Sequence, residues 1–159
     1  MTIREKLESM KEISERNNTR EKEFEARERD GKIRAVFVDV YGSERAEVVW
    51  VKPELDEYYQ LLQCHTVDMP MRNIGGQRFQ IICDDEGLLR SDYRVSAFGK
   101  STHEPMLAGN ILICQYDGKE DVVGLTEEET IFVMNHVRKL KINYNGCPQS
   151  WQIIKDMSY

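Results

Sequence analysis

The residues whose types could support chemistry lie near the middle of the chain. Asp84, Asp85 and Glu86 stand consecutively before Gly87 at the end of an apolar run, and His103 follows in a polar stretch. Hard divalent cations take several oxygen ligands, so this acidic turn and His103 indicate one candidate activity, metal-dependent hydrolysis. The turn lacks the ligand spacing of a calcium-binding loop, and acidic residues before a glycine are also common as turn-forming residues. The sequence shows no nucleophile with an orienting partner beside this histidine.

Other residue types that often mark an active site do not occur in the required patterns. Gly75-Gly76 has neither the glycine spacing nor the following helix of a phosphate-binding loop. The four cysteines are at least 19 residues apart, without a C-x-x-C pair, which is typical of reduced structural thiols. They are Cys64, Cys83, Cys114 and Cys147. We therefore predict no catalytic residue, no metal and no cofactor, and expect a protein that is not an enzyme.

The first thirty residues form a distinct segment that we expect to be a charged helical arm. They contain eight Lys or Arg and nine Asp or Glu. Thr2 and Glu5 make a capping-box pattern, and a narrow apolar stripe follows at Ile3, Leu7, Met10 and Ile13. A stripe this narrow does not hold a helix alone in water. The arm therefore docks on the rest of the chain, pairs with a second copy in a homo-oligomer, or binds a partner.

Residues 31–159 predict a single α+β domain with a mainly antiparallel sheet of about five strands and two or three helices. Glycine-containing links join the strand patterns into two hairpins, and Thr126 with Glu129 makes a second capping box. The strand patterns cover 33–40, 46–51, 66–71, 78–83 and 107–116; helices are expected after Lys52-Pro53 and over about 127–140; residues 143–159 predict a short helix or strand. Residues 84–106 lack periodicity, which is typical of a long functional loop.

Composition and charge limit the class of partner. The chain has 159 residues, of which 40% are hydrophobic and 31% charged, and its formal net charge is −6. That charge argues against direct nucleic-acid binding, which needs clustered Lys and Arg, and leaves open a protein partner with a basic surface. No run approaches the roughly 20 apolar residues that span a bilayer, and the first residues lack the apolar segment of a signal peptide. We therefore expect a cytoplasmic protein without membrane partners.

Two runs, FQIICDDEGLL and LAGNILICQYDG followed by LTEEE, occur in an order that resembles a known family. Over about residues 47–137 the chain resembles the phage and mobile-element family called domain of unknown function 3846. The resemblance implies a small α+β protein encoded by an accessory gene of a mobile element and located in the bacterial host cytosol. It implies no reaction and no catalytic residue.

The resemblance and the acidic charge together lead to a hypothesis about function. We expect a phage or mobile-element protein that binds and inhibits a host defence or nucleic-acid-processing protein, alone or in complex with nucleic acid, as anti-CRISPR and anti-restriction proteins do. The alternatives are an oligomeric small-molecule or nucleotide sponge with residues 84–104 as a lid, and a metal-dependent hydrolase. The predicted contact residues are Arg4, Lys11, Arg16, Arg20, Phe24 and Arg27 in the arm, with Asp84, Asp85, Glu86, Arg90, Tyr93, Arg94 and His103 in the 84–104 loop.

Overall fold

The computed structural model describes residues 2–11, 30–100 and 104–159, and the chain divides into two compact units, Met1–Lys32 and Ile33–Tyr159. In the first unit residues 3–11 are helical. The Thr2 N–H donates to Glu5 Oε2 at 3.0 Å and the Glu5 N–H donates to Thr2 Oγ1 at 3.2 Å, which confirms the predicted capping box. Three apolar side chains of this helix are exposed, namely Ile3, Leu7 and Met10.

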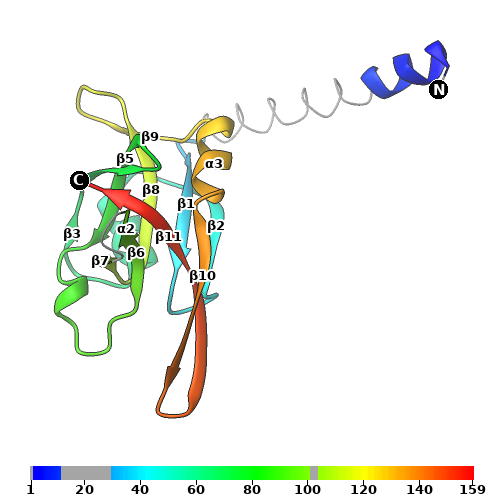
Figure 1. Ribbon diagram of the computed structural model, residues 1–159. Coiled ribbons are helices and arrows are strands. Elements are labelled where there is room, and N and C mark those ends of the chain that lie inside the picture. Colours follow the sequence, from blue (N-terminus) through cyan, green and yellow to red (C-terminus); the bar gives the residue numbers. More distant parts are fainter. Residues whose placement is uncertain (1, 12–29, 101–103) are drawn as a thin grey trace. The chain divides into compact units, whose positions relative to one another are not determined.

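The second unit is built on a large mixed sheet of eleven strands (Figure 1). Its strands are β1 Ile33–Asp39, β2 Arg45–Val51, β3 Val67–Asp68, β4 Met71–Ile74, β5 Gln77–Asp84, β6 Val95–Gly99, β7 Pro105–Ala108, β8 Ile111–Tyr116, β9 Val122–Val123, β10 Val137–Tyr144 and β11 Cys147–Ser158. The strand order is β2-β1-β8-β5-β4-β11-β6-β7, with β10 beside β11, β3 beside β5 and β9 beside β8. The α+β class is therefore right at the coarse level, but the expected sheet of about five strands is wrong.

The pairings explain why the sheet is mixed. Every adjacent pair of strands is antiparallel except β6 and β11, which run parallel. Two predicted hairpins are confirmed, β1 with β2 and β4 with β5. Gly75 and Gly76 form the second turn with φ angles of 56° and 87°, a conformation of successive positive φ that glycine adopts without steric cost.

The central strands are buried on both faces, so the sheet has a core on each side. Along β1, Val36 and Val38 pack into one cluster, while Ala35 and Phe37 pack into the other. Helix α2 (Leu55–Leu62) contributes Tyr58 and Leu62 to the second cluster. Strands buried on both faces read as continuous apolar runs instead of alternating ones, which is why their sequences are the easiest strands to identify.

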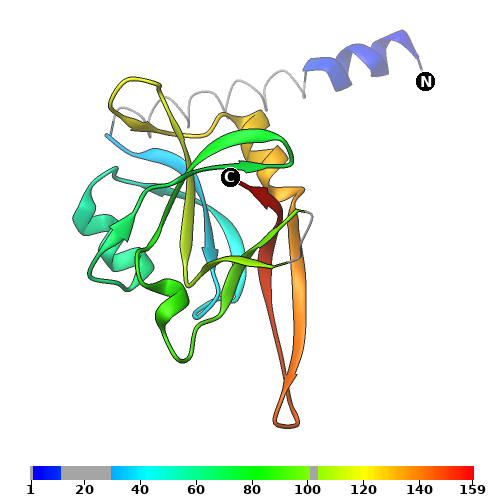
Figure 2. The same cartoon turned by 60° about the vertical axis from the view of Figure 1, so that its left-hand side comes forward.

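The sheet curls until β11 meets β2, although the two strands are not neighbours in the strand order (Figure 2). The Gln152 N–H donates to Glu44 O at 2.9 Å, and the Ala46 N–H donates to Gln152 Oε1 at 2.8 Å. These bonds fix the middle of β11 against the β1–β2 hairpin. The remainder of the β10–β11 hairpin extends beyond the body of the unit (Figure 2).

At the C-terminal end the predicted helix over 127–140 differs from the structure, whereas residues 143–159, predicted as a short helix or strand, contain the strand β11. Helix α3 covers Glu127–Met134, not 127–140, and it buries Val133 while Ile131 is exposed. The capping box at its start is confirmed by reciprocal bonds between Thr126 and Glu129. The chain then turns and continues as β10, because Val137–Tyr144 pairs with β11 over eight residue pairs. Apolar residues recur every three positions from Ile131 to Leu140, which favours a helix in the sequence. Pairing with the distant strand β11 nevertheless makes Val137–Tyr144 a strand.

The segment 84–106 is not the irregular loop that the sequence predicts. It contains a short 3-10 helix, η1 (Gly87–Leu89), and the strands β6 and the start of β7. Strand β6 is rich in small residues and lies between β11 and β7. Its partners are distant in sequence or irregular in register, so local pattern alone does not identify it. Within the described ranges, no helix has the length and apolar character needed to cross a membrane.

Candidate functional site

The acidic turn at the end of β5 is organised by one carboxylate. Arg90 donates to Asp84 Oδ2 from Nε at 2.8 Å and from Nη2 at 2.7 Å, and the Glu86 N–H donates to Asp84 Oδ1 at 3.0 Å. The Asp84 side chain is only 7% exposed. Both of its oxygens therefore hold the turn together, whereas Asp85 and Glu86 are exposed to solvent.

Gly87 is required at this turn by a close backbone approach. A Cβ atom at this position would lie 2.3 Å from the carbonyl oxygen of Ala108 at the end of β7. That distance is far inside van der Waals contact, so η1 packs directly on β7 only because residue 87 has no side chain. The acidic turn is thus followed by a helix that packs against the sheet at β7.

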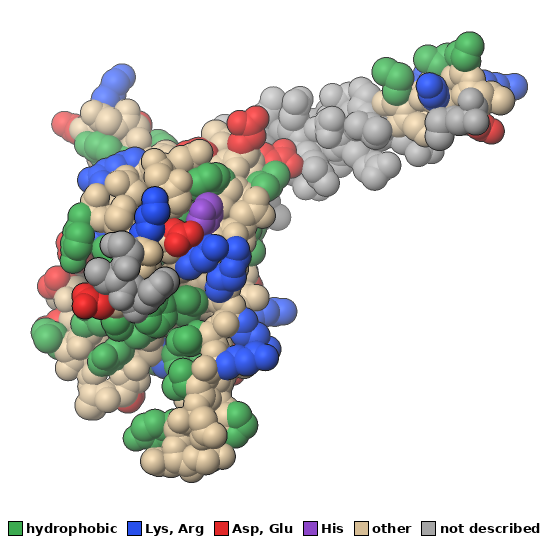
Figure 3. Space-filling model, in the orientation of Figure 1, with side chains coloured by type: hydrophobic (Ala, Val, Ile, Leu, Met, Phe, Trp, Pro, Cys, Tyr) green, Lys and Arg blue, Asp and Glu red, His purple; other side chains and the backbone are tan. Residues whose placement is uncertain are grey.

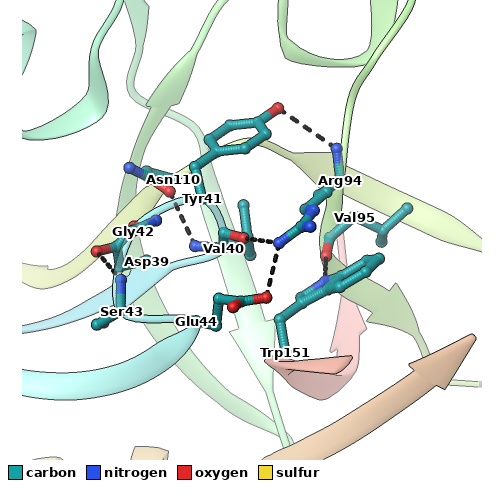
Figure 4. Close-up of polar contacts among 10 residues, drawn as sticks. All are labelled: Asp39, Val40, Tyr41, Gly42, Ser43, Glu44, Arg94, Val95, Asn110 and Trp151. Carbon is teal, nitrogen blue, oxygen red and sulfur yellow. Dashed lines mark hydrogen bonds and ion pairs between the residues drawn. The ribbon is translucent and has the colours of Figure 1, made fainter. Parts of the chain in front are cut away.

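Arg94 fixes the following residues to the β1–β2 turn (Figure 4). Its Nη1 donates to Val40 O and to Glu44 Oε2, each at 2.8 Å. The guanidinium carbon lies 4.7 Å from the centre of the Trp151 ring, within the range of a cation–π contact. The Arg94 N–H also donates to the Tyr41 hydroxyl at 3.3 Å. Arg94 was predicted as a partner contact, but the structure uses its charge to join three distant segments.

The β1–β2 turn itself is held from within. The Asp39 carboxylate accepts from the Gly42 N–H at 2.7 Å and from the Ser43 N–H at 2.8 Å, and the Val40 N–H donates to Asn110 Oδ1 at 2.9 Å. A buried amide that accepts such a bond satisfies a main-chain group that would otherwise be costly to bury. The result is a rigid corner, drawn in Figure 4, against which Arg94 is placed.

A small pocket of about 270 Å³ opens beside this corner. Its lining consists of Tyr41, Leu62, Gln63, Asp84, Arg90, Asp92 and Gly109. The pocket combines carboxylates, a guanidinium and a phenol with a leucine, a mixture that suits a small polar molecule. Its volume is slightly below the roughly 300–1,000 Å³ that ligand pockets usually have.

The end of the β10–β11 hairpin is the largest continuous exposed element among the described residues of the second unit. All eight residues from 141 to 148 are exposed. They include Tyr144, whose residue is 65% exposed, and Ile142, which is 37% exposed. Asn145 and Gly146 form the turn with φ angles of 51° and 80°. Sequence reasoning missed this element, although an Asn-Gly pair between alternating residues is a strong hairpin signal.

The base of this hairpin is anchored in the core. Trp151 is only 5% exposed, and its Nε1–H donates to Val95 O at 2.8 Å. Ile153 and Ile154, which follow it on β11, are also buried. The hairpin thus has a base fixed in the core and an end that is exposed to solvent, which is an arrangement suited to contact with a partner.

Charge on the hairpin differs from that of the rest of the chain. Arg138, Lys139 and Lys141 lie on β10, and the sequence contains no Asp or Glu between residues 130 and 155. Figure 3 shows Lys and Arg side chains gathered along this hairpin, with hydrophobic side chains at its end. A basic element therefore projects from a chain whose net charge is −6.

The thiols divide into two groups by burial. Cys64, Cys83 and Cys114 are buried, and burial raises the pKa of all three, to about 12 for Cys83 and for Cys114. Thiols with such pKa values are poor nucleophiles at neutral pH. Cys147 is exposed, next to the hairpin turn. Across the described ranges, three or more His, Cys, Asp or Glu side chains do not gather as a metal site would require.

The structure places the predicted contact residues in different environments. Asp84, Arg90 and Arg94 are engaged in internal bonds, although Arg90 is also exposed; the other exposed members are Arg4, Lys11, Asp85, Glu86 and Tyr93. Next to Glu86, Leu88 and Leu89 of η1 are also exposed. The remaining predicted residues, Arg16, Arg20, Phe24, Arg27 and His103, lie outside the described residues. The hydrolase hypothesis, which needs His103, stays a prediction.

Comparison with known proteins identifies a family but no activity. The family described as Domain of unknown function (DUF3846) matches residues 33–139. The match covers the sheet from β1 to the start of β10 and leaves out the exposed end of the hairpin and β11. No curated protein and no solved structure matches the chain.

Proposed function

Because the chain belongs to the family described as Domain of unknown function (DUF3846), whose description names no activity, we propose a function from its geometry. The protein is a binding protein, and the exposed end of the β10–β11 hairpin, residues 141–148, makes its principal contact with a partner. The observation that carries this proposal is the solvent exposure of eight consecutive residues on a hairpin whose base is anchored by Trp151.

The energetics of the hairpin support a role in binding. A two-stranded ribbon without further packing is at best marginally stable in water. Packing against a partner would therefore stabilise residues 141–148. Its rigid base lowers the entropy lost on association, which is a general advantage of a preorganised contact. Ile142 and Tyr144 lie on one face, because residues two apart on a strand point to the same side. Aromatic side chains of this kind are enriched among the residues that dominate interface energies.

We propose further that the partner is a host defence or nucleic-acid-processing protein, which the bound chain inhibits by occlusion. This step is supported by the resemblance to mobile-element proteins and by the acidic charge of the chain outside the hairpin. It is an analogy at the level of the family. The rigid corner around Arg94 would then serve to hold the hairpin and the acidic turn in a fixed relation.

The test compares two surfaces of the same protein in an affinity capture from the lysate of a bacterial host. One variant removes the apolar side chains of the hairpin end, Ile142→Ser with Tyr144→Ser; the matched control removes exposed leucines of the predicted loop, Leu88→Ser with Leu89→Ser. We expect a stoichiometric partner with the parent protein and with the control, and at least about a ten-fold loss with the hairpin variant, since truncating central interface residues costs 2 kcal/mol or more.

Two outcomes would contradict the proposal. Equal capture by the hairpin variant would exclude residues 142 and 144 as the main contact. Loss of capture only with the leucine variant would move the contact to η1, near the residues predicted from the sequence. Unfolding curves of each variant establish that a loss of capture is not a loss of fold, because all four side chains are exposed.

The small-molecule alternative is favoured by one specific observation, the pocket beside the β1–β2 turn. The Arg90 and Asp84 side chains in its lining are bonded to each other, so the exposed Asp92 carboxylate and the Gln63 amide are the groups that could hold a small polar molecule. A bound compound released on denaturing the purified protein, and reduced in an Asp92→Asn variant, would support this second candidate. Purified protein that releases no compound and shows no ligand-induced rise in melting temperature would count against it.

A further inference from the structure

The outer edge of β10 offers a row of main-chain groups. β10 pairs with β11 from Val137 opposite Ile154 to Tyr144 opposite Cys147, and within the described residues no strand pairs with its other edge. The edge N–H and C=O groups of such a strand can bond to an added strand. An extended segment of a partner could therefore continue the hairpin as its third strand.

Two lysines give this edge of β10 a positive charge. Lys139 and Lys141 are exposed and lie two residues apart, so they point to the same face. The register places Gln152 opposite the first and Ser150 opposite the second, so neither has an acidic cross-strand neighbour on β11. Arg138 lies on the other face and donates to the carbonyl oxygens of Asn135 and Val137 at 2.9 and 2.7 Å. The two lysines therefore supply the positive charge on their face of β10, whereas the Arg138 guanidinium is held at the start of the strand on the opposite face.

This charge pattern selects against a second copy of the same strand. In an antiparallel pair of two β10 strands that keeps Leu140 of both copies on one face, the lysines of both copies meet on the other face. Like charges directly opposite each other destabilise a strand pair, whereas opposite charges stabilise it. Lysine on an edge strand is a known protection against self-pairing. The edge is therefore closed to its own copy and open to an acidic strand.

We propose that β10 binds an extended acidic segment of a partner protein by strand addition, with carboxylates that alternate with apolar residues. The carboxylates lie opposite Lys139 and Lys141, and the apolar residues lie on the face of Leu140 and Ile142. This inference rests on the proposed function and names the class of segment that the hairpin recognises. Nucleic acid is a less suitable occupant, because two lysines neutralise few phosphates and the rest of the chain is acidic.

The test uses fluorescent peptides of about twelve residues, enough to pair along the whole of β10 at roughly 3.4 Å per residue. One peptide alternates Glu with Val, a second alternates Lys with Val, and a third repeats the first with N-methylated alternate amides, which keeps the charges but removes main-chain bonds. With the full chain we expect the Glu peptide to bind about ten-fold more tightly than the Lys peptide, from two opposed charge pairs. The N-methylated peptide should lose most of this binding.

Charge reversal supplies the matched comparison. The double variant Lys139→Glu with Lys141→Glu should reverse the preference in favour of the Lys peptide. The control Lys52→Glu with Lys119→Glu makes the same change of net charge at exposed lysines away from β10, and should leave the preference unchanged.

Several outcomes would overturn the inference. Equal binding of the N-methylated and the unmodified Glu peptides would exclude main-chain pairing, and an unchanged peptide preference after charge reversal at 139 and 141 would exclude the two lysines. No binding of any peptide would also overturn it, as would binding of a short DNA duplex that depends on the two lysines while the peptides do not bind. Failure here is distinguishable from failure of the proposed function. If host-partner capture depends on Ile142 and Tyr144 but not on the lysines, the hairpin remains the contact and strand addition is wrong.

Discussion

Replacing Arg94 by methionine should destabilise the fold while leaving the partner contact in place. Methionine keeps most of the apolar stem but removes the guanidinium from Val40 O and Glu44 Oε2, each 2.8 Å away, and from the Trp151 ring. The bond to the Val40 carbonyl comes from a charged donor and contributes about 1.5–2 kcal/mol. The partly exposed ion pair with Glu44 adds up to about 1 kcal/mol, and the cation–π contact about 0.5–1 kcal/mol.

Together these contacts predict a loss of about 3 kcal/mol in the free energy of unfolding. The assay is urea unfolding followed by tryptophan fluorescence, because Trp151 lies against the removed group. Glu44→Gln is the matched comparison: it weakens only the ion pair and should cost no more than about 1 kcal/mol. Arg94→Met within about 0.5 kcal/mol of the parent, the usual range for surface substitutions, would refute the interpretation of Arg94 as a clamp.

Three further predictions concern a close approach, a helix cap and the thiols. Gly87→Ala should cost about 2–4 kcal/mol, as overpacking does in tight sites, because the added methyl would lie 2.3 Å from the Ala108 carbonyl oxygen; the melting temperature reports it. Thr126→Ala should cost about 1 kcal/mol through loss of the α3 cap, measured by urea unfolding. Partial burial alone would raise the pKa of Glu129, but hydrogen bonds from Thr126 and from the Gln115 amide outweigh the effect of burial and lower that pKa. The stabilising contribution of the Glu129 carboxylate should therefore be present at neutral pH and be lost as the pH falls through the folded-state pKa. Maleimide at neutral pH should label Cys147 alone in the folded protein, since the other three thiols are buried with raised pKa values, and mass spectrometry counts the labels.

Each of these predictions has a matched control. Glu86→Ala, at the exposed residue beside Gly87, should change stability by less than about 0.5 kcal/mol; an equal loss would show that the close approach is not the cause. Glu129→Gln should flatten the acid dependence, and an unchanged dependence would contradict the assigned role. A Cys147→Ser protein should take up no label while folded. Labelling of Cys114 in the folded state would contradict its burial.

Local signals in the sequence identify the elements that are stabilised locally. The capping boxes at Thr2 and Thr126 and the Gly75-Gly76 turn are found because cap, turn and flanking residues lie within a few positions of one another. The acidic turn was also correctly interpreted as turn-forming, since Asp84 bonds to the Glu86 N–H two residues away.

The remaining features depend on contacts between distant residues. Arg94 bonds to residues 54 and 50 positions away, and Trp151 bonds to a carbonyl 56 positions away. No local sequence pattern marks the residues to which Arg94 and Trp151 bond. From the sequence alone, Arg94 is therefore expected to be an unpaired cation on the surface. The hairpin end is different, because the Asn145-Gly146 pair was available as a signal. This signal was overlooked because the apolar spacing after residue 130 predicted a helix as far as residue 140, where the structure has α3 ending at Met134 and then β10.

The most direct measurement of the central claim is photo-crosslinking in host lysate, with a photoreactive amino acid placed at residue 144 or at residue 93. Both positions carry exposed tyrosines, one at the hairpin end and one in the segment predicted from the sequence. The account predicts a single discrete adduct from residue 144, competed by unlabelled protein, and little or none from residue 93. An adduct from residue 93 alone, or from neither position while the partner is captured in full, would contradict the hairpin as the contact surface.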